Sequence, residues 1–189
     1  LGSGGREHAF AWKISQSKKC DKLFIAPGNP GTAQCGENIS IGVNDFEKIA
    51  KFSLEKNIKM IVVGPEDPLV NGVYDYFQNN SELKNMAVIG PSKNGAMLEG
   101  SKNFAKEFMQ KYNIPTAKYQ TFTKDTLQNG IEFLQTVQAP FVLKADGLAA
   151  GKGVVICPTL EEAKKELTEM LADAKLGNAS AKVVREEFL

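Results

Sequence analysis

Two lysines enclose a glycine-rich segment, KADGLAAGKGV, at residues 144–154. Glycines allow backbone N–H groups to turn toward a phosphate, and Lys144 and Lys152 add positive charge beside it. The segment is not a Walker A loop, because its glycine spacing is one residue short and Gly153 stands where a Ser or Thr binds magnesium. The flanking apolar runs predict a strand, a glycine loop and a second strand. This pattern indicates a phosphate-binding hairpin, but an ordinary flexible hairpin has the same composition.

A second glycine-rich turn, GSGG at residues 2–5, is followed at once by Arg6. The next helix would begin there, and its free N–H groups and dipole favour a phosphate or another anion. Arg6 could bind that anion through two hydrogen bonds. A tight strand-to-helix turn with a surface arginine fits the same residues equally well. The third glycine of a dinucleotide fingerprint is missing, which argues against a Rossmann dehydrogenase.

Other polar residues lie where the predicted elements end. Glu66 follows a buried apolar run and could hold an amine or a ribose hydroxyl, whereas Asp67 suits the N-cap of the next helix. Lys102 could reach a phosphate, although a lone helical lysine is usually solvated. Residues 186–189, EEFL, have the composition of an adenine hinge, but a simple strand end explains them better without further information.

These residues need a scaffold, and the first half of the chain predicts a parallel one. Strand-like runs at residues 22–26, 60–63 and 86–89 alternate with helical patterns at residues 6–17, 45–56 and 70–77. Such alternation predicts a doubly wound parallel sheet, in which ligands bind beyond the carboxyl ends of the strands.

The second half changes character near residues 99–102. Ser101 could cap a helix that runs to about residue 112. Strand, helix, hairpin and helix patterns follow, and they predict a small α+β unit with an antiparallel hairpin. In order, the expected elements cover residues 118–122, 125–136, 141–144, 154–157, the amphipathic segment after residue 159, and a last strand from residue 183.

Composition excludes several functions. The chain has 189 residues, of which 42% are hydrophobic and 24% are charged, and its net charge of +1 gives no long-range attraction to nucleic acid or acidic membranes. No apolar run approaches the roughly 20 residues of a membrane span. With a single histidine, His8, a zinc site or a Ser–His–Asp triad has little to draw on. Three widely spaced cysteines suit a reducing cytosol. We therefore expect a cytoplasmic domain without nucleic-acid or membrane partners.

Both ends suggest a piece of a longer polypeptide. Leu1 stands directly before the first glycine turn, where an α/β domain normally has a buried strand, and the last strand has nothing after it. The expected domains are residues 1–100 and 101–189, the second being incomplete.

Five motifs together resemble the glycinamide ribonucleotide synthetase family of ATP-grasp ligases. In chain order they are GSGGREHA, APGNPGT, GPEDPLVNG, EGSK and KADGLAAGKGV, and REEFL at the end is similar to the hinge of that family. The matches keep the order of the family and cover essentially the whole chain. Arg185 departs from the pattern, since the family usually has an apolar residue there, and this predicts a less buried strand end.

The resemblance implies a pre-ATP-grasp domain followed by the first, α+β part of an ATP-grasp domain. It also implies a reaction in which ATP, glycine and 5-phosphoribosylamine give glycinamide ribonucleotide, ADP and phosphate through a glycyl phosphate, in purine synthesis. Mg²⁺ is the expected metal and Mn²⁺ an alternative; no metal ligand is expected before residue 189. On this view the chain alone is inactive, and a monomer is favoured.

The resemblance carries roles to individual residues. The residues implied to bind ATP are Lys102, Lys144, Gly147, Gly151, Lys152, Gly153, Glu186, Phe188 and Leu189. The residues implied on the phosphoribosylamine side are Gly5, Arg6 and Glu66. Other ATP-grasp carboxylate–amine ligases and a noncatalytic nucleotide-binding module remain as alternatives.

Overall fold

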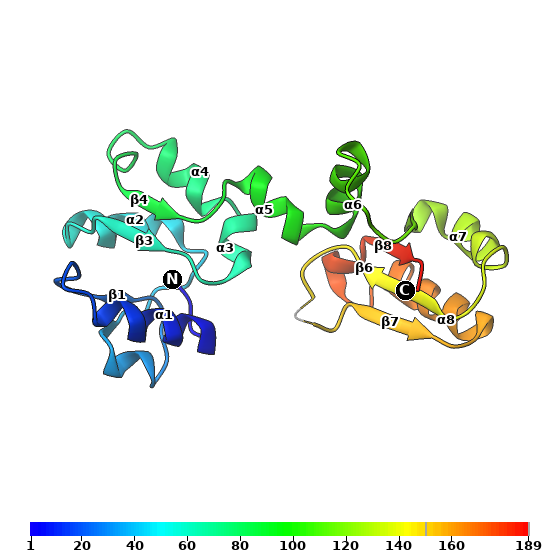
Figure 1. The fold of residues 1–189 in the computed structure, drawn as a ribbon, viewed down its shortest axis with the longest axis horizontal. Helices are drawn as coiled ribbons and strands as arrows, with labels where there is room; N and C mark the ends of the chain where they lie inside the picture. The colour runs from blue at the N-terminus through cyan, green and yellow to red at the C-terminus, as the bar shows by residue number, and fades with distance from the viewer. Residues whose placement is uncertain (150, 189) are drawn as a thin grey trace. The chain divides into compact units, whose positions relative to one another are not determined.

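Short parallel strands alternate with helices in the first part of the chain (Figure 1). The computed structural model describes residues 1–149 and 151–188, and the chain divides into two compact units, Leu1–Ala96 and Met97–Leu189. The first unit contains α1 (Gly5–Ser15), β1 (Phe24–Ile25), η1 (Thr32–Gln34), β2 (Glu37–Asn38), α2 (Phe46–Glu55), β3 (Met60–Val62), α3 (Glu66–Val70), α4 (Val73–Gln78) and β4 (Ala87–Ile89). The helix α5 (Lys93–Gly100) contains the boundary between the units.

The strands of the first unit form two parallel pairs, β1 with β2 and β3 with β4. Residues at the start of the chain join both pairs at their carboxyl ends. The amide of Gly2 donates to the carbonyl of Ala26 at 2.7 Å, and the amide of Gly28 donates back to Gly2 at 3.1 Å. The amide of Gly64 donates to the carbonyl of Leu1 at 3.1 Å. The predicted parallel α/β architecture is confirmed, and three loops meet at one edge of it.

Helix capping and apolar packing explain where α2 begins and which face it buries. Asp45 is its N-cap, as expected, and accepts a hydrogen bond from the backbone amide of Lys48 at 3.3 Å. Ile49 and Ala50 then pack against β3, β4 and α4. The buried residues of this core are Ile49, Ala50, Ile61, Val63, Val73, Phe77, Leu83 and Val88.

The prediction of a single helix over residues 70–77 is wrong, because the helical region is interrupted at Gly72. The chain forms two short helices, α3 and α4, because Gly72 between them has φ of 96°. This left-handed conformation is accessible to glycine at little cost, and it reorients the chain between the two helices.

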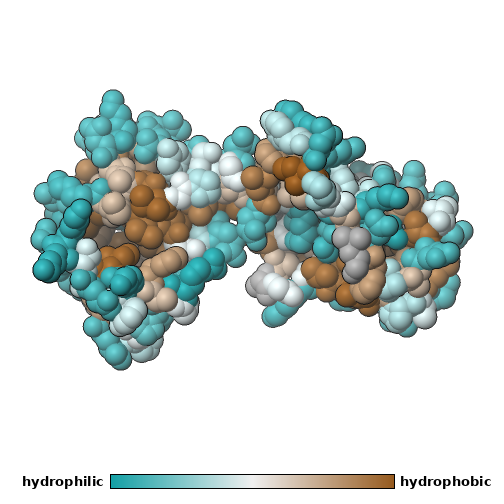
Figure 2. Space-filling model, in the orientation of Figure 1, coloured by the Kyte–Doolittle hydropathy of each residue, from teal (hydrophilic) through white to brown (hydrophobic). Residues whose placement is uncertain are grey.

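Apolar surface remains on the first unit near its strands. Met60 in β3 is 57% exposed, and brown surface covers the β3–β4 pair in Figure 2. An apolar cleft of about 840 Å³ is lined by residues of α1, β1, α2 and β3. Leu1 and Gly64, which share a backbone hydrogen bond, also line this cleft.

An antiparallel sheet is the framework of the second unit. Its strand order is β5-β8-β6-β7, and β6 and β7 form the expected hairpin. Its elements are α6 (Lys102–Lys111), β5 (Tyr119–Thr123), η2 (Lys124–Thr126), α7 (Leu127–Leu134), β6 (Phe141–Ala145), β7 (Val154–Cys157), α8 (Leu160–Leu171), η3 (Gly177–Ser180) and β8 (Lys182–Glu186). The last strand therefore ends at Glu186, earlier than the sequence suggests.

The two faces of this sheet differ. Alternate residues along each strand point to opposite faces. One face, with Phe122, Leu143 and Val183, packs against α7 and α8. The other face, which carries Lys144 and Glu186, meets side chains of α6. This division sets the polar groups of the unit apart from its apolar core.

Candidate functional site

Charged side chains gather on the α6 face of the sheet. Lys144 is the fourth residue of β6, between Leu143 and Ala145, and the pleat turns it away from the α7–α8 core. Its ammonium nitrogen Nζ donates to Oε2 of Glu186, the last residue of β8, at 2.9 Å. Two of the residues predicted to bind ATP are therefore direct partners.

A lysine that sequence reasoning missed completes this cluster. Lys106, in the middle of α6, places its Nζ 3.2 Å from the same Oε2 of Glu186. The side chain of Lys106 is only 6% exposed and that of Glu186 only 11%. The spacing of the lysines could have indicated its position, because Lys106 follows Lys102 by four residues and therefore lies on the same face of the helix. Nothing in its local sequence marks it as buried.

The beginning of α6 is fastened to the end of β6. Ser101 caps the helix, as predicted, by accepting a hydrogen bond from the amide of Phe104 at 3.1 Å. Its hydroxyl also donates to the carboxylate of Asp146, which accepts a further bond from the amide of Asn103 at 2.7 Å. Asp146 was not singled out from the sequence, although it lies within the glycine-rich motif. It fixes the base of the glycine loop to the helix.

Lys102 lies at this junction. Its Nζ is 3.4 Å from the carbonyl of Asp146 and 3.3 Å from that of Gly147. Burial lowers the pKa of Lys102 below the usual lysine value, and the carboxylate of Asp146 partly opposes that shift. The nearby ammonium of Lys144 lowers this pKa further. Lys102 at the start of α6 and Lys144 in β6 thus both lie beside the base of the glycine loop.

The glycine loop between β6 and β7 is anchored at its base. The amide of Gly147 donates to the carbonyl of Ala179 at 3.0 Å, and the carbonyl of Gly153 accepts from Ala145 at 2.7 Å. Gly151 has φ of 79°, and both it and Lys152 are exposed. The predicted phosphate-binding glycines therefore stand on a fixed stem and have an exposed tip.

The predicted adenine residues are only partly described. The carboxylate of Glu186 is directed to the two lysines. Phe188 follows the strand and is 52% exposed, so it offers apolar surface. Leu189 lies outside the described residues, as does Ala150 of the glycine-rich motif.

The expectation of an exposed strand end at Arg185 is wrong. Arg185 is only 8% exposed, and its guanidinium carbon lies 5.8 Å from the centre of the Phe133 ring in α7. Burial lowers the pKa of this guanidinium. A long side chain can cover apolar surface with its stem, and an arginine thus occupies a position that the pattern assigns to an apolar residue.

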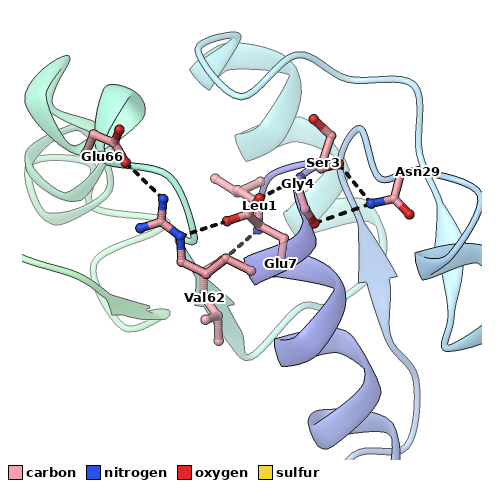
Figure 3. A network of polar contacts seen from close by, with 8 residues as sticks. Leu1, Ser3, Gly4, Glu7, Asn29, Val62 and Glu66 are labelled. Atoms are coloured by element: carbon pink, nitrogen blue, oxygen red, sulfur yellow. Dashed lines mark hydrogen bonds and ion pairs between the residues drawn. The ribbon is translucent and has the colours of Figure 1, made fainter. Parts of the chain in front are cut away.

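In the first unit, Arg6 and Glu66 are brought together. The Nη2 atom of Arg6, at the start of α1, lies 3.3 Å from Oε2 of Glu66 in α3 (Figure 3). Both side chains are exposed, and that of Arg6 is 61% exposed. Gly5 is the residue before Arg6 and is also exposed. All three predicted substrate-side residues therefore lie at one edge of the parallel strands.

The loop after β1 holds the glycine turn in place. Figure 3 shows the side chain of Asn29 directed at the turn. Its Nδ2 donates to the carbonyl of Ser3 at 2.8 Å, while its Oδ1 accepts from the amides of Gly31 and Thr32. Asn29 thus links the glycine turn at residues 2–5 to its own loop at residues 28–32.

Glu7 is a third residue that sequence reasoning missed, after Lys106 and Asp146. It is buried, and its Oε2 accepts from the amide of Gly4 at 2.6 Å, closing the first turn of α1. Its Oε1 is buried without a hydrogen-bond partner and lies 3.6 Å from Nε of Arg6. A methyl group at Gly2 or Gly64 would overlap the Glu7 side chain. The glycines therefore make room for this carboxylate.

Asp67 does not cap α3 as expected. The helix begins at Glu66, two residues earlier than a cap at Asp67 would give, and Pro65 is its N-cap. The carboxylate of Asp67 accepts hydrogen bonds from the side-chain amides of Asn44 and Asn71, at 2.5 and 3.2 Å. It stabilises the contact between the α3 turn and the loop before α2.

Neither a metal cluster nor a membrane span is found in the described part of the chain. Within residues 1–149 and 151–188, no three His, Cys, Asp or Glu side chains are grouped so that they could hold a metal ion. None of the helices described there is long and apolar enough to cross a membrane.

The fold and the lysine face define the class of protein: an α/β unit followed by an antiparallel sheet with a lysine-bearing glycine hairpin, as in ATP-grasp proteins. Comparison with protein families identifies it further. Residues 1–99 match the phosphoribosylglycinamide synthetase N domain, and residues 100–189 match the ATP-grasp (A) domain of the same enzyme. The chain belongs to the phosphoribosylglycinamide synthetase family, which confirms the resemblance seen in its motifs.

Individual relatives agree with this family. The chain is 50% identical over 192 residues to a phosphoribosylamine–glycine ligase of Pseudomonas putida, and the match covers 100% of this chain and 43% of the relative. The crystal structure of the same ligase from Thermotoga maritima matches with a TM-score of 0.76 at 34% identity, and it too is covered over 43% of its length.

A more distant structure shares the fold alone. It is the biotin carboxylase domain of a Hydrogenobacter thermophilus 2-oxoglutarate carboxylase in complex with MgADP, ADP and bicarbonate. The TM-score is 0.70 at 17% identity, and the match covers 100% of this chain and 43% of that one. In all three comparisons the chain spans less than half the length of the protein it matches.

Proposed function

We propose that this chain forms part of an enzyme that ligates glycine to 5-phosphoribosylamine at the expense of ATP. The products are glycinamide ribonucleotide, ADP and phosphate, in the synthesis of purines. The observation that carries the proposal is that Lys102 contacts the base of the glycine loop and that Lys144 lies in β6, the strand that leads into it. Membership of the family and the names of the relatives support the choice of substrates.

The two parts of the chain have separate tasks in this proposal. Residues 1–100 form the substrate-side domain that precedes the ATP-grasp domain, and residues 101–189 form the first part of the ATP-grasp domain. The matches to the N domain and to the ATP-grasp (A) domain support this division.

The nucleotide side rests on the second unit. Lys102 and Lys144 bind the phosphates of ATP as cations, and the backbone amides of residues 147–153 close over them. Lys152, exposed at the loop tip, joins the phosphates when the loop closes. Phe188 and Leu189 line the adenine pocket at the end of β8. Glu186 contributes to the adenine pocket through the position of its backbone at the end of β8, because its carboxylate is engaged by two lysines.

The phosphoribosylamine side rests on the first unit. Arg6 binds the 5-phosphate together with the amide of Gly5 at the start of α1. Glu66 holds the amine or a ribose hydroxyl. The ion pair between Arg6 and Glu66, at 3.3 Å, supports this pairing because it keeps the two groups poised at one edge.

The proposed chemistry has two steps. A carboxylate oxygen of glycine attacks the γ-phosphorus of ATP, the bond to the β-phosphate oxygen breaks, and ADP leaves. The amine of phosphoribosylamine then attacks the carbonyl carbon of the glycyl phosphate, and inorganic phosphate leaves with one former glycine oxygen. A loop that excludes water is needed, since water would otherwise hydrolyse the acyl phosphate.

Mg²⁺ would screen the phosphate charges when bound. A distant relative in fold was crystallised with MgADP, which supports a magnesium nucleotide as the ligand. The described residues do not fit a magnesium site, since they contain no suitable carboxylate cluster. We propose that its ligands belong to the part of the family's length that this chain does not span, and we assign no step to the metal here.

The test uses a polypeptide that contains this chain and has the length of its relatives. ADP release should require both glycine and phosphoribosylamine, and glycine labelled with ¹⁸O in its carboxylate should transfer one label to phosphate. Lys144→Met should reduce turnover by at least about 100-fold, since it removes a charge that contacts the phosphates. ADP release that continues unchanged without glycine would refute the ligase. Nucleotide binding without turnover would instead favour a noncatalytic module.

A further inference from the structure

Lys106 is a buried ammonium group that the proposed chemistry does not use. Its Nζ lies 2.8 Å from Oγ1 of Thr116, 3.1 Å from the carbonyl of Ala117 and 3.2 Å from Oε2 of Glu186. Two of its three N–H donors form hydrogen bonds with Thr116 and Ala117, and Glu186 is its ion-pair partner. The ring centre of Tyr119 lies 5.7 Å away and covers the cation further. Because its side chain is only 6% exposed and is surrounded by these partners, Lys106 is not accessible to a ligand.

Lys144 shares the same carboxylate oxygen but differs in its surroundings. Its Nζ donates to Oε2 of Glu186 at 2.9 Å, and its side chain is 26% exposed. One of its donors is used by Glu186, which leaves two that can reach a phosphate. Glu186 thus contacts both a buried lysine that a ligand does not reach and a partly exposed lysine with two free donors.

The charges of the three groups sum to +1 when all are ionised, from two lysines and one glutamate. Without the charge of Lys106, Glu186 and Lys144 would form an ion pair with no net charge. Oε2 of Glu186, which the two lysines share, would then be held by Lys144 alone, and the carboxylate would repel an incoming phosphate more strongly. The orientation of Lys144 and the net charge of the face consequently both depend on Lys106.

We propose that Lys106 is a positioning residue for nucleotide binding. It holds Glu186 against the sheet and neutralises it, so that Lys144 keeps its free donors and its charge for the phosphates. This inference rests on the proposed nucleotide site, but Lys106 itself does not touch the nucleotide. It acts through Glu186.

The experiment measures ADP affinity by calorimetry, and the KM and kcat for ATP, in the polypeptide of the relatives' length. Lys106→Met should weaken ADP binding roughly tenfold, within the usual range of coupling between contacting residues. The KM for ATP should rise by a similar factor, with a smaller change in kcat. Lys111→Met is the matched control, because it removes an exposed lysine from the same helix. The control should leave ADP affinity unchanged.

A double-mutant cycle distinguishes positioning from simple stabilisation. In a Glu186→Gln background, Lys106→Met should change ADP affinity less than about twofold, because the group through which it acts has lost its charge. An equal effect in both backgrounds would overturn the inference. If Lys106→Met does not fold in a thermal scan, Lys106→Gln replaces it, since an amide retains hydrogen bonding without the charge.

The outcomes also separate this inference from the proposed function. If the parent protein binds no ADP, the proposed function fails and this inference fails with it. If the parent binds ADP and the folded Lys106 variant binds it equally well, only the positioning role is overturned.

Discussion

The hydroxyl of Ser101 donates to the carboxylate of Asp146, with oxygen–oxygen distances of 3.0 and 2.9 Å, and thereby joins the start of α6 to the end of β6. The same carboxylate accepts from the amide of Asn103 at 2.7 Å. Ser101 and Asp146, which are 45 residues apart in the chain, therefore take part in one helix cap. Lys102 lies between the two donors in sequence, so its position depends on this cap.

Replacing Asp146 should loosen that junction. Asp146→Ala removes the acceptor of the Asn103 amide, and a donor that loses its partner costs about 1–3 kcal/mol of unfolding free energy. Urea denaturation measures the loss, and hydrogen exchange of the Asn103 amide should accelerate. The control is Asp173→Ala, because Asp173 is exposed. Unchanged exchange at Asn103 would contradict the role given to Asp146.

Replacing Lys102 should separate function from stability. Lys102→Met should weaken ADP binding, because a cation next to the phosphates is lost. Burial disfavours the charged form of Lys102, so unfolding free energy near neutral pH should stay constant or rise by less than about 1 kcal/mol. A large loss of stability together with unchanged ADP binding would assign Lys102 a structural role instead.

The same pKa shift gives the sign of a pH dependence. Folding lowers the pKa of Lys102 below the value of 10.5 for an unperturbed lysine. Its cost to stability is therefore complete below the folded-state pKa and disappears as the pH rises toward 10.5. The stability difference between Lys102→Met and the parent, measured by urea denaturation from pH 7 to pH 10.5, should accordingly shrink with rising pH.

Replacing Gly64 should displace Glu7. A methyl group at Gly64 would overlap the Glu7 carboxylate, so Gly64→Ala should lower unfolding free energy by about 1–3 kcal/mol. In a Glu7→Ala background the same substitution should cost much less, because the overlapping group is gone. Additive losses in thermal or urea unfolding would show that the contact is unimportant. Gly42→Ala is the control, since a methyl group there meets nothing within 4 Å.

Local patterns predicted the elements well. The caps at Asp45 and Ser101 and the amphipathic α8 were placed correctly, because each depends on residues within one or two turns. The break at Gly72 was missed because glycine also occurs inside helices. Glycine content alone does not reveal which positions adopt a left-handed φ.

The site was predicted less completely, because its partners are distant in sequence. Lys102, Lys144 and the glycine loop come from recognisable motifs, whereas Lys106 and Asp146 gain their roles only when α6 meets the sheet. For Arg185 the sequence-based prediction was wrong, since its side chain was expected to be exposed and is buried. A buried arginine beside an aromatic ring cannot be distinguished from a surface arginine by its sequence position.

The neighbours Arg185 and Glu186 point to opposite faces of β8, one toward the ring of Phe133 and the other toward two lysines. Substitutions that alter the packing against α7 and substitutions that alter the charged face therefore fall at alternating positions of this strand. A relative can exchange one residue to suit a different α7 while it preserves the next residue for its ligand. This separation allows the α7–α8 side of the sheet to change in sequence without altering the charged groups on the α6 side.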